Sequence, residues 1–99
     1  MATVEYLVPV QHPAADGHFP GNPIIPGAVL LAETLQAIAD SAAIRLAPCQ
    51  IKSAKFFQPV RPGDRMLIDF AQSSPGEIRF TCAVDGKTVL AGQVKCDHQ

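Results

Sequence analysis

The sequence predicts an α+β fold in which a curved antiparallel sheet of about five strands wraps around one long central helix. Two patterns carry this prediction. A proline- and glycine-rich stretch runs directly into a long apolar segment without proline, and the second half of the chain alternates strand-like segments with turn signals. The chain has 99 residues, 47% of them hydrophobic, which suits one small domain over residues 1–99.

The first half of the chain predicts a strand, a long loop and a helix. Thr3–Val10 is rich in β-branched and aromatic residues and is expected to form a strand. Gln11–Pro26 holds too many prolines and glycines for a helix or a central strand, which indicates a shaped loop. Strong helix formers follow from Gly27 to about Leu46, where Pro48 limits the helix. Apolar residues occupy most of the circumference of this helix, which predicts burial on most of its sides.

The second half predicts four antiparallel strands. Their expected bounds are Ile51–Phe57, Arg65–Gln72, Glu77–Val84 and Thr88–Lys95. Asp85-Gly86 is a strong hairpin signal between the last two strands. Gly92 interrupts the last strand and is expected to mark a β-bulge. Phe56 and Phe57 point to opposite faces, so we expect one of them to pack on the helix. The other could line a tunnel or a dimer contact, but core packing is favoured for it.

Composition and charge exclude several classes of function. The net charge is −1, which gives no support for nucleic-acid binding. The longest apolar run, around Ala28–Ala32, is too short to span a membrane, and the start of the chain lacks the pattern of a signal peptide. Cys49, Cys82 and Cys96 form no CxxC pattern and are interpreted as reduced thiols of a cytoplasmic protein. No ligand spacing for a metal is present, and no cofactor is expected.

Residues His18 to Gly27 carry the most specific signal. Their sequence, HFPGNPIIPG, resembles the signature of the 3-hydroxyacyl-(acyl carrier protein) dehydratases of fatty-acid synthesis, and the segment from Lys55 to Asp64 is also similar to that family. The resemblance implies a hotdog fold and an obligate dimer, hence a homodimer or higher even oligomer, with the active site between subunits. It implies an acyl carrier protein or CoA thioester as substrate, bound in a tunnel beside the helix.

The chemistry of dehydration agrees with these residues. Removal of water from a 3-hydroxyacyl thioester needs a base for the α-proton, an acid for the leaving hydroxyl and a donor for the thioester oxygen. A histidine titrates near neutral pH, and N–H groups at a helix N-terminus stabilise developing negative charge. The resemblance assigns the base to His18 and the oxygen donors to the N–H groups of Gly27 and Ala28. It also assigns the shape of the loop to Phe19, Pro20, Gly21 and Pro26.

One position departs from the family. Its catalytic carboxylate normally stands fourteen residues after the histidine, which is Ala32 here, and the acid of this chain is Glu33. A family glutamine aligns with Gln36 and supports an alignment without gaps. One residue rotates a side chain by about 100° around a helix. Either an insertion near Ala28 returns Glu33 to the site, or the site lacks its acid, or Glu33 reaches it sideways.

Three functions follow from these alternatives. The first is a dehydratase with His18 and Glu33 as catalytic residues. The second is a non-catalytic hotdog subunit that binds acyl thioesters or pairs with a catalytic homologue, which Ala32 favours. The third is an acyl thioesterase, which the HFPG loop argues against because thioesterases of this fold generally lack it.

Overall fold

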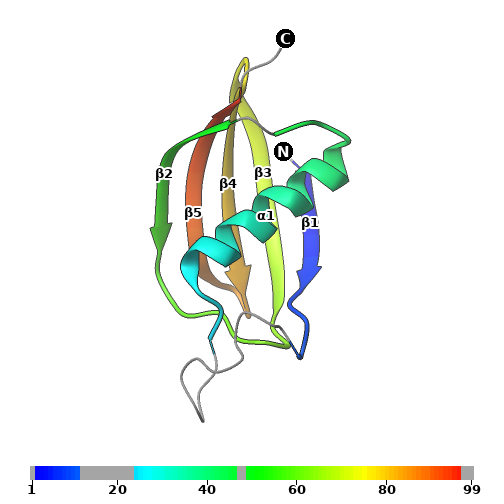
Figure 1. The fold of residues 1–99 in the computed structure, drawn as a ribbon, viewed down its shortest axis with the longest axis vertical. Coiled ribbons are helices and arrows are strands. Elements are labelled where there is room, and N and C mark those ends of the chain that lie inside the picture. Colours follow the sequence, from blue (N-terminus) through cyan, green and yellow to red (C-terminus); the bar gives the residue numbers. More distant parts are fainter. Residues whose placement is uncertain (1, 12–23, 47–48, 97–99) are drawn as a thin grey trace.

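A computed structural model describes residues 2–11, 24–46 and 49–96 of the chain. The order of elements is β1 (Ala2–Leu7), α1 (Gly27–Ala42), β2 (Cys49–Phe56), β3 (Arg65–Ser74), β4 (Glu77–Val84) and β5 (Lys87–Cys96). The strands form one antiparallel sheet in the order β1-β3-β4-β5-β2, and α1 lies across one of its faces (Figure 1). The predicted α+β layout of one helix and five strands is confirmed.

The core lies between α1 and the sheet. Strand β3 buries Met66, Ile68 and Phe70 and exposes the residues between them, as a period of two requires for a sheet with one buried face. Strand β4 buries Phe80 and Cys82 in the same way. Within the described residues, no helix has the length and apolar content needed to cross a membrane.

Backbone hydrogen bonds of residues just before and just after Gly27 fix the start of α1. The N–H of Ile25 donates to the Val60 carbonyl at 2.8 Å, and the Ile25 side chain is 4% exposed. Pro26 is the N-cap, and the first helical hydrogen bond runs from the Leu30 N–H to the Pro26 carbonyl at 3.0 Å. The bond spans four residues, so α1 is a regular α-helix from its first turn.

The end of α1 differs from the prediction of about Leu46. The helix stops at Ala42 because Ala43 adopts the left-handed region with φ 55°, and the Ile44 N–H then donates to the Ala39 carbonyl at 3.1 Å. This bond is the 6→1 bond of a Schellman motif. A left-handed alanine costs roughly 1–2 kcal/mol, and the turn allows Leu46 to enter the core at 6% exposure. Burial of Leu46 offsets that cost.

The expectation that α1 is buried on most sides is wrong for this single chain. Its buried residues are Leu30, Leu31, Thr34 and Ile38, all on the face toward the sheet. Ala28 and Ala32 are exposed, and Leu35 and Ala39 are only partly buried. The sheet covers one face of a helix, so apolar residues on the other flanks stay accessible.

The expected bulge at Gly92 is also wrong. Gly92 pairs in register with Phe80 of β4 and with Ala54 of β2. The irregularities in the pairing of β5 lie elsewhere. One falls between Ile51 and Ser53 of β2, and the other between Cys82 and Ala83 of β4. A Cβ atom at residue 92 would lie 2.7 Å from Cζ of Phe80 and 2.7 Å from the Ser53 carbonyl oxygen. Glycine is therefore required here by a close approach of neighbours.

Candidate active site

The N-terminal end of α1 is where the sequence places the thioester-binding groups. Gly27 is the first helical residue and Ala28 the second. A helix leaves its first N–H groups without intrahelical partners, and Pro26, as N-cap, offers no side-chain acceptor. The first turn also holds no acidic side chain. The end of the helix therefore presents N–H donors and the positive end of the macrodipole to an incoming oxygen.

Phe56 lies against this helix end. Its ring atoms come within 3.1–3.3 Å of the place where a Cβ atom of Gly27 would stand. A groove of about 420 Å³ opens here, lined by Ile24, Ile25, Gly27, Leu30, Phe56, Phe57, Gln58, Pro59 and Val60. Phe56 packs on the helix, as predicted for one of the two rings, and is 46% exposed. The core packing favoured for the other ring is wrong, because Phe57 is 52% exposed. Both rings line the groove beside the helix N-terminus.

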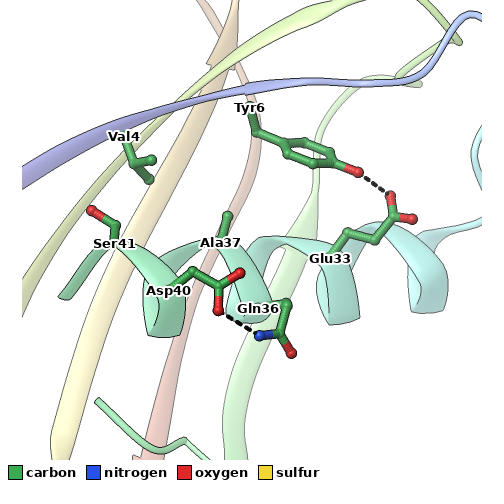
Figure 2. A pocket seen from close by; sticks show the side chains of 7 residues that line it. All are labelled: Val4, Tyr6, Glu33, Gln36, Ala37, Asp40 and Ser41. Carbon is green, nitrogen blue, oxygen red and sulfur yellow. Dashed lines mark hydrogen bonds between the residues drawn. The ribbon is translucent and has the colours of Figure 1, made fainter. Parts of the chain in front are cut away.

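Glu33 lies on the flank of α1 that faces β1. The phenol O–H of Tyr6, on β1, donates to Oε1 of Glu33 at 3.0 Å (Figure 2). Burial raises the pKa of Tyr6 to about 12, and the hydrogen bond to Glu33 and its negative charge act in the same direction. The structure therefore joins Glu33 to Tyr6, a residue that the sequence did not single out.

A groove of about 490 Å³ surrounds this pair. Its lining residues are Val4, Tyr6, Glu33, Gln36, Ala37, Asp40 and Ser41. Figure 2 shows Gln36 about one turn and Asp40 about two turns further along α1, and Nε2 of Gln36 donates to Oδ1 of Asp40 at 2.8 Å. These two residues also line the groove on the other flank of α1, so their hydrogen bond forms the ridge between the two grooves.

Ala32 faces that second groove, on the side of β2. The groove has a volume of about 440 Å³ and is lined by Ala32, Leu35, Gln36, Ala39, Asp40, Ile44, Arg45, Leu46 and Cys49. Because α1 is regular from Gly27 onward, Ala32 and Glu33 are separated by about 100° around its axis. The described helix entry is regular, and the alternative of an insertion near Ala28 relative to the family stays a prediction.

The predicted base and most of its loop lie outside the described residues. These are His18, Phe19, Pro20 and Gly21. Their roles stay predictions, as does the catalytic role of Glu33. Tyr6 was missed because its only sequence signal is its place two residues after Val4, on one face of a strand. Nothing local to β1 indicates contact with a residue 27 positions away.

Comparison with known proteins connects the chain to dehydratases. The family described as ApeI-like, ApeI dehydratase, matches residues 1–93. The 3-hydroxyacyl-[acyl-carrier-protein] dehydratase FabZ of Sodalis glossinidius is 35% identical over 102 aligned positions, which cover 90% of this chain and 68% of that protein. FabZ of Klebsiella pneumoniae is 36% identical with the same coverage.

Solved structures agree on the fold. A chain of the dehydratase heterocomplex ApeI:P from Xenorhabdus doucetiae superposes with a TM-score of 0.76 at 20% identity, covering 96% of this chain and 86% of that one. The fluoroacetyl-CoA-specific thioesterase FlK superposes with a TM-score of 0.66 at 12% identity, covering 99% and 89%. At these identities the likeness establishes the fold alone, and the predicted hotdog fold is confirmed.

Proposed function

The chain belongs to the ApeI-like dehydratase family, and from this premise we propose that it removes water from a 3-hydroxyacyl thioester to give a trans-2-enoyl thioester. The junction between signature and helix is the observation that supports this most. The HFPGNPIIPG signature ends at Gly27, which is the first residue of α1. The donors of the helix end therefore follow directly on the segment that carries His18.

The proposed reaction uses these groups in a fixed order. His18 takes the α-proton, and the electron pair moves toward the thioester carbonyl. The N–H groups of Gly27 and Ala28 hold the oxygen on which negative charge develops. The 3-hydroxyl then leaves as water after it receives a proton from an acid. No cofactor is needed for these steps.

The proton donor for the leaving hydroxyl is the group that this site positions least well. Glu33 is the carboxylate that α1 offers in the first turns, and Tyr6 binds it on the β1 flank. The position that the family uses for its acid, Ala32, faces the groove near Cys49. We therefore propose that Glu33 donates the proton poorly, and that dehydration by this chain is slow.

In the test, purified protein is incubated with 3-hydroxyacyl substrates of several chain lengths, carried on acyl carrier protein or on CoA. Formation of the enoyl product is followed by absorbance. We expect turnover that His18→Ala abolishes. His98→Ala is the matched control, since it removes an imidazole near the C-terminal end, and it should leave turnover unchanged. No turnover of any substrate by the wild-type protein would contradict the proposal.

A non-catalytic subunit is the second candidate, and the Tyr6–Glu33 hydrogen bond favours it. In this case the protein binds an acyl thioester without turnover, or it completes the site of a homologous catalytic chain. The ApeI:P complex is a dehydratase heterocomplex, which makes a paired homologue a reasonable partner. Equilibrium binding of a non-hydrolysable acyl-pantetheine, measured together with turnover, separates the two candidates.

Strand β2 supports a dimer as part of the proposal. It pairs with β5 on one side and lies at an edge of the sheet (Figure 1). Its residues from Gln50 to Phe56 are exposed, including Ile51 at 50%. An exposed edge strand is a template for pairing with another chain. We propose a homodimer through this edge, located in the cytoplasm, with acyl carrier protein or CoA as carrier of the substrate.

A further inference from the structure

Two cysteines stand opposite each other at the margin of the sheet. Cys49 is the first residue of β2, Cys96 is the last residue of β5, and the two are direct partners in the antiparallel register. Directly opposed residues place their side chains on the same face of a sheet. Cys96 is 4% exposed, whereas Cys49 is partly exposed and lines the groove beside Ala32. No disulfide joins the three cysteines of the described structure.

The hydrogen bonds of β5 define which kind of pair this is. The N–H of Cys96 donates to the Gly76 carbonyl at 2.7 Å, on the β4 side of β5. In a strand the N–H and C=O of one residue point to the same side, so those of Cys96 point away from β2. Cys49 and Cys96 therefore form a non-hydrogen-bonded pair, the type in which opposed Cα atoms are typically about 4.5 Å apart and side chains approach most closely.

From this geometry we propose that Cys49 and Cys96 are an oxidation site, which a small disulfide oxidant converts to an intrachain cross-strand disulfide. Disulfides join Cα atoms about 4.4–6.8 Å apart, and the expected separation lies at the short end of that range. Bonds formed near the limits of their geometry are the more easily reduced ones. The bond is therefore reversible with a thiol reductant.

The exchange balances with glutathione disulfide as the oxidant. The thiolate of Cys49, the more accessible sulfur, attacks the disulfide, forms a mixed disulfide and releases one glutathione. The thiolate of Cys96 then attacks the Cys49 sulfur and releases the second glutathione. Two protein thiols lose two electrons and two protons, and the oxidant becomes two thiols.

Cys82 provides the internal control. It lies on β4 at 0% exposure, and its Sγ is 3.8 Å from Oγ1 of Thr34. Burial raises the pKa of the Cys82 thiol to about 11, which disfavours the thiolate needed for exchange. Its register partners are Ile68 on β3 and Leu90 on β5. Neither is a cysteine, so Cys82 has no cross-strand partner for a disulfide.

The test treats the protein with glutathione disulfide and measures intact mass, reactive thiols under denaturing conditions, and mobility on a non-reducing gel. We expect a monomer lighter by two hydrogens, with one reactive thiol left of the three cysteines and a higher Tm, all reversed by dithiothreitol. Cys82→Ala should keep the mass and Tm changes, and Cys49→Ser should abolish them.

Other outcomes overturn the proposal. A glutathione adduct that persists on the wild-type protein would show that Cys96 does not resolve the mixed disulfide. A covalent dimer would show that Cys49 meets a second chain instead of Cys96. An unchanged mass at every ratio of glutathione to its disulfide would show that the pair is inert. Cys49→Ser changes a partly exposed residue at a strand end, so it removes the pair without altering the buried Cys96.

Discussion

Ala32→Glu tests most directly where this site needs its acid. Ala32 is exposed on α1 and faces the groove near Cys49, so a longer side chain meets no packed neighbour there. Glutamate is nearly as good a helix former as alanine, which limits the cost to a few tenths of a kcal/mol. A positioned general acid contributes about 10²–10⁴-fold to rate. At about 1.36 kcal/mol for each factor of ten, this lowers the barrier by roughly 3–5 kcal/mol.

The assay compares kcat and KM of wild type and Ala32→Glu on the best 3-hydroxyacyl substrate. We expect kcat to rise by about 10²–10⁴-fold with little change in KM, because the acid acts on the leaving group and not on binding. Ala42→Glu is the matched control, since it makes the same substitution at an exposed residue at the far end of α1. It should leave kcat unchanged.

The reasoning is refuted if the folded Ala32→Glu protein is no faster than wild type, or if Ala42→Glu is accelerated equally. The second result would assign the gain to charge on the helix and not to position. Glu33→Gln completes the set: it should have little effect in the Ala32→Glu background if the new carboxylate is the acid.

Three further predictions concern stability. Tyr6→Phe should lower the free energy of unfolding by about 1 kcal/mol in a urea titration, because it removes the hydrogen bond to Glu33. Folding raises the pKa of Tyr6 from 10.0 to about 12, so the contribution of Tyr6 to stability is complete below pH 10 and falls as pH rises toward 12. Thermal melts of the wild-type protein should show this loss of stability. An equal loss in Tyr6→Phe would show that Tyr6 is not its cause. Gly92→Ala should destabilise by about 1–3 kcal/mol in the same titration, because its Cβ atom would lie 2.7 Å from both Phe80 and the Ser53 carbonyl. A neutral Gly92→Ala would show that β5 can shift without cost.

Local sequence signals correctly predicted those elements in which one residue type sets the backbone conformation. Pro26 before Gly27 placed the start of α1 correctly, because proline suits the entry of a helix and cannot continue one. Asp85-Gly86 placed the β4–β5 hairpin, where both residues have positive φ, 52° and 78°. The bounds of β4 were predicted without error from its alternation of buried and exposed residues.

The features that were missed depend on distant parts of the chain. Ala43 ends α1 in a left-handed conformation that alanine does not favour, and burial of Leu46 three residues later compensates. Gly92 is a glycine because Phe80 and Ser53 approach it from two other strands. At the candidate site, the spacing of Ala32 and Glu33 raised the question of the acid, and the catalytic role of Glu33 stays a prediction. The contact of Glu33 with Tyr6 was missed because only the assembled sheet brings β1 to α1.

The strand order also constrains how the protein folds during synthesis. Strand β2 is made directly after α1, but its neighbour in the sheet is β5, the last strand of the chain. Strand β2 therefore has no neighbouring strand in the sheet until residues 87–96 have been synthesised. Pairing between such distant segments is slow because a long loop must close first. Pairing of subunits through the β2 edge, as we propose, therefore depends on a contact between residues 49–56 and residues 87–96, which are far apart in the sequence.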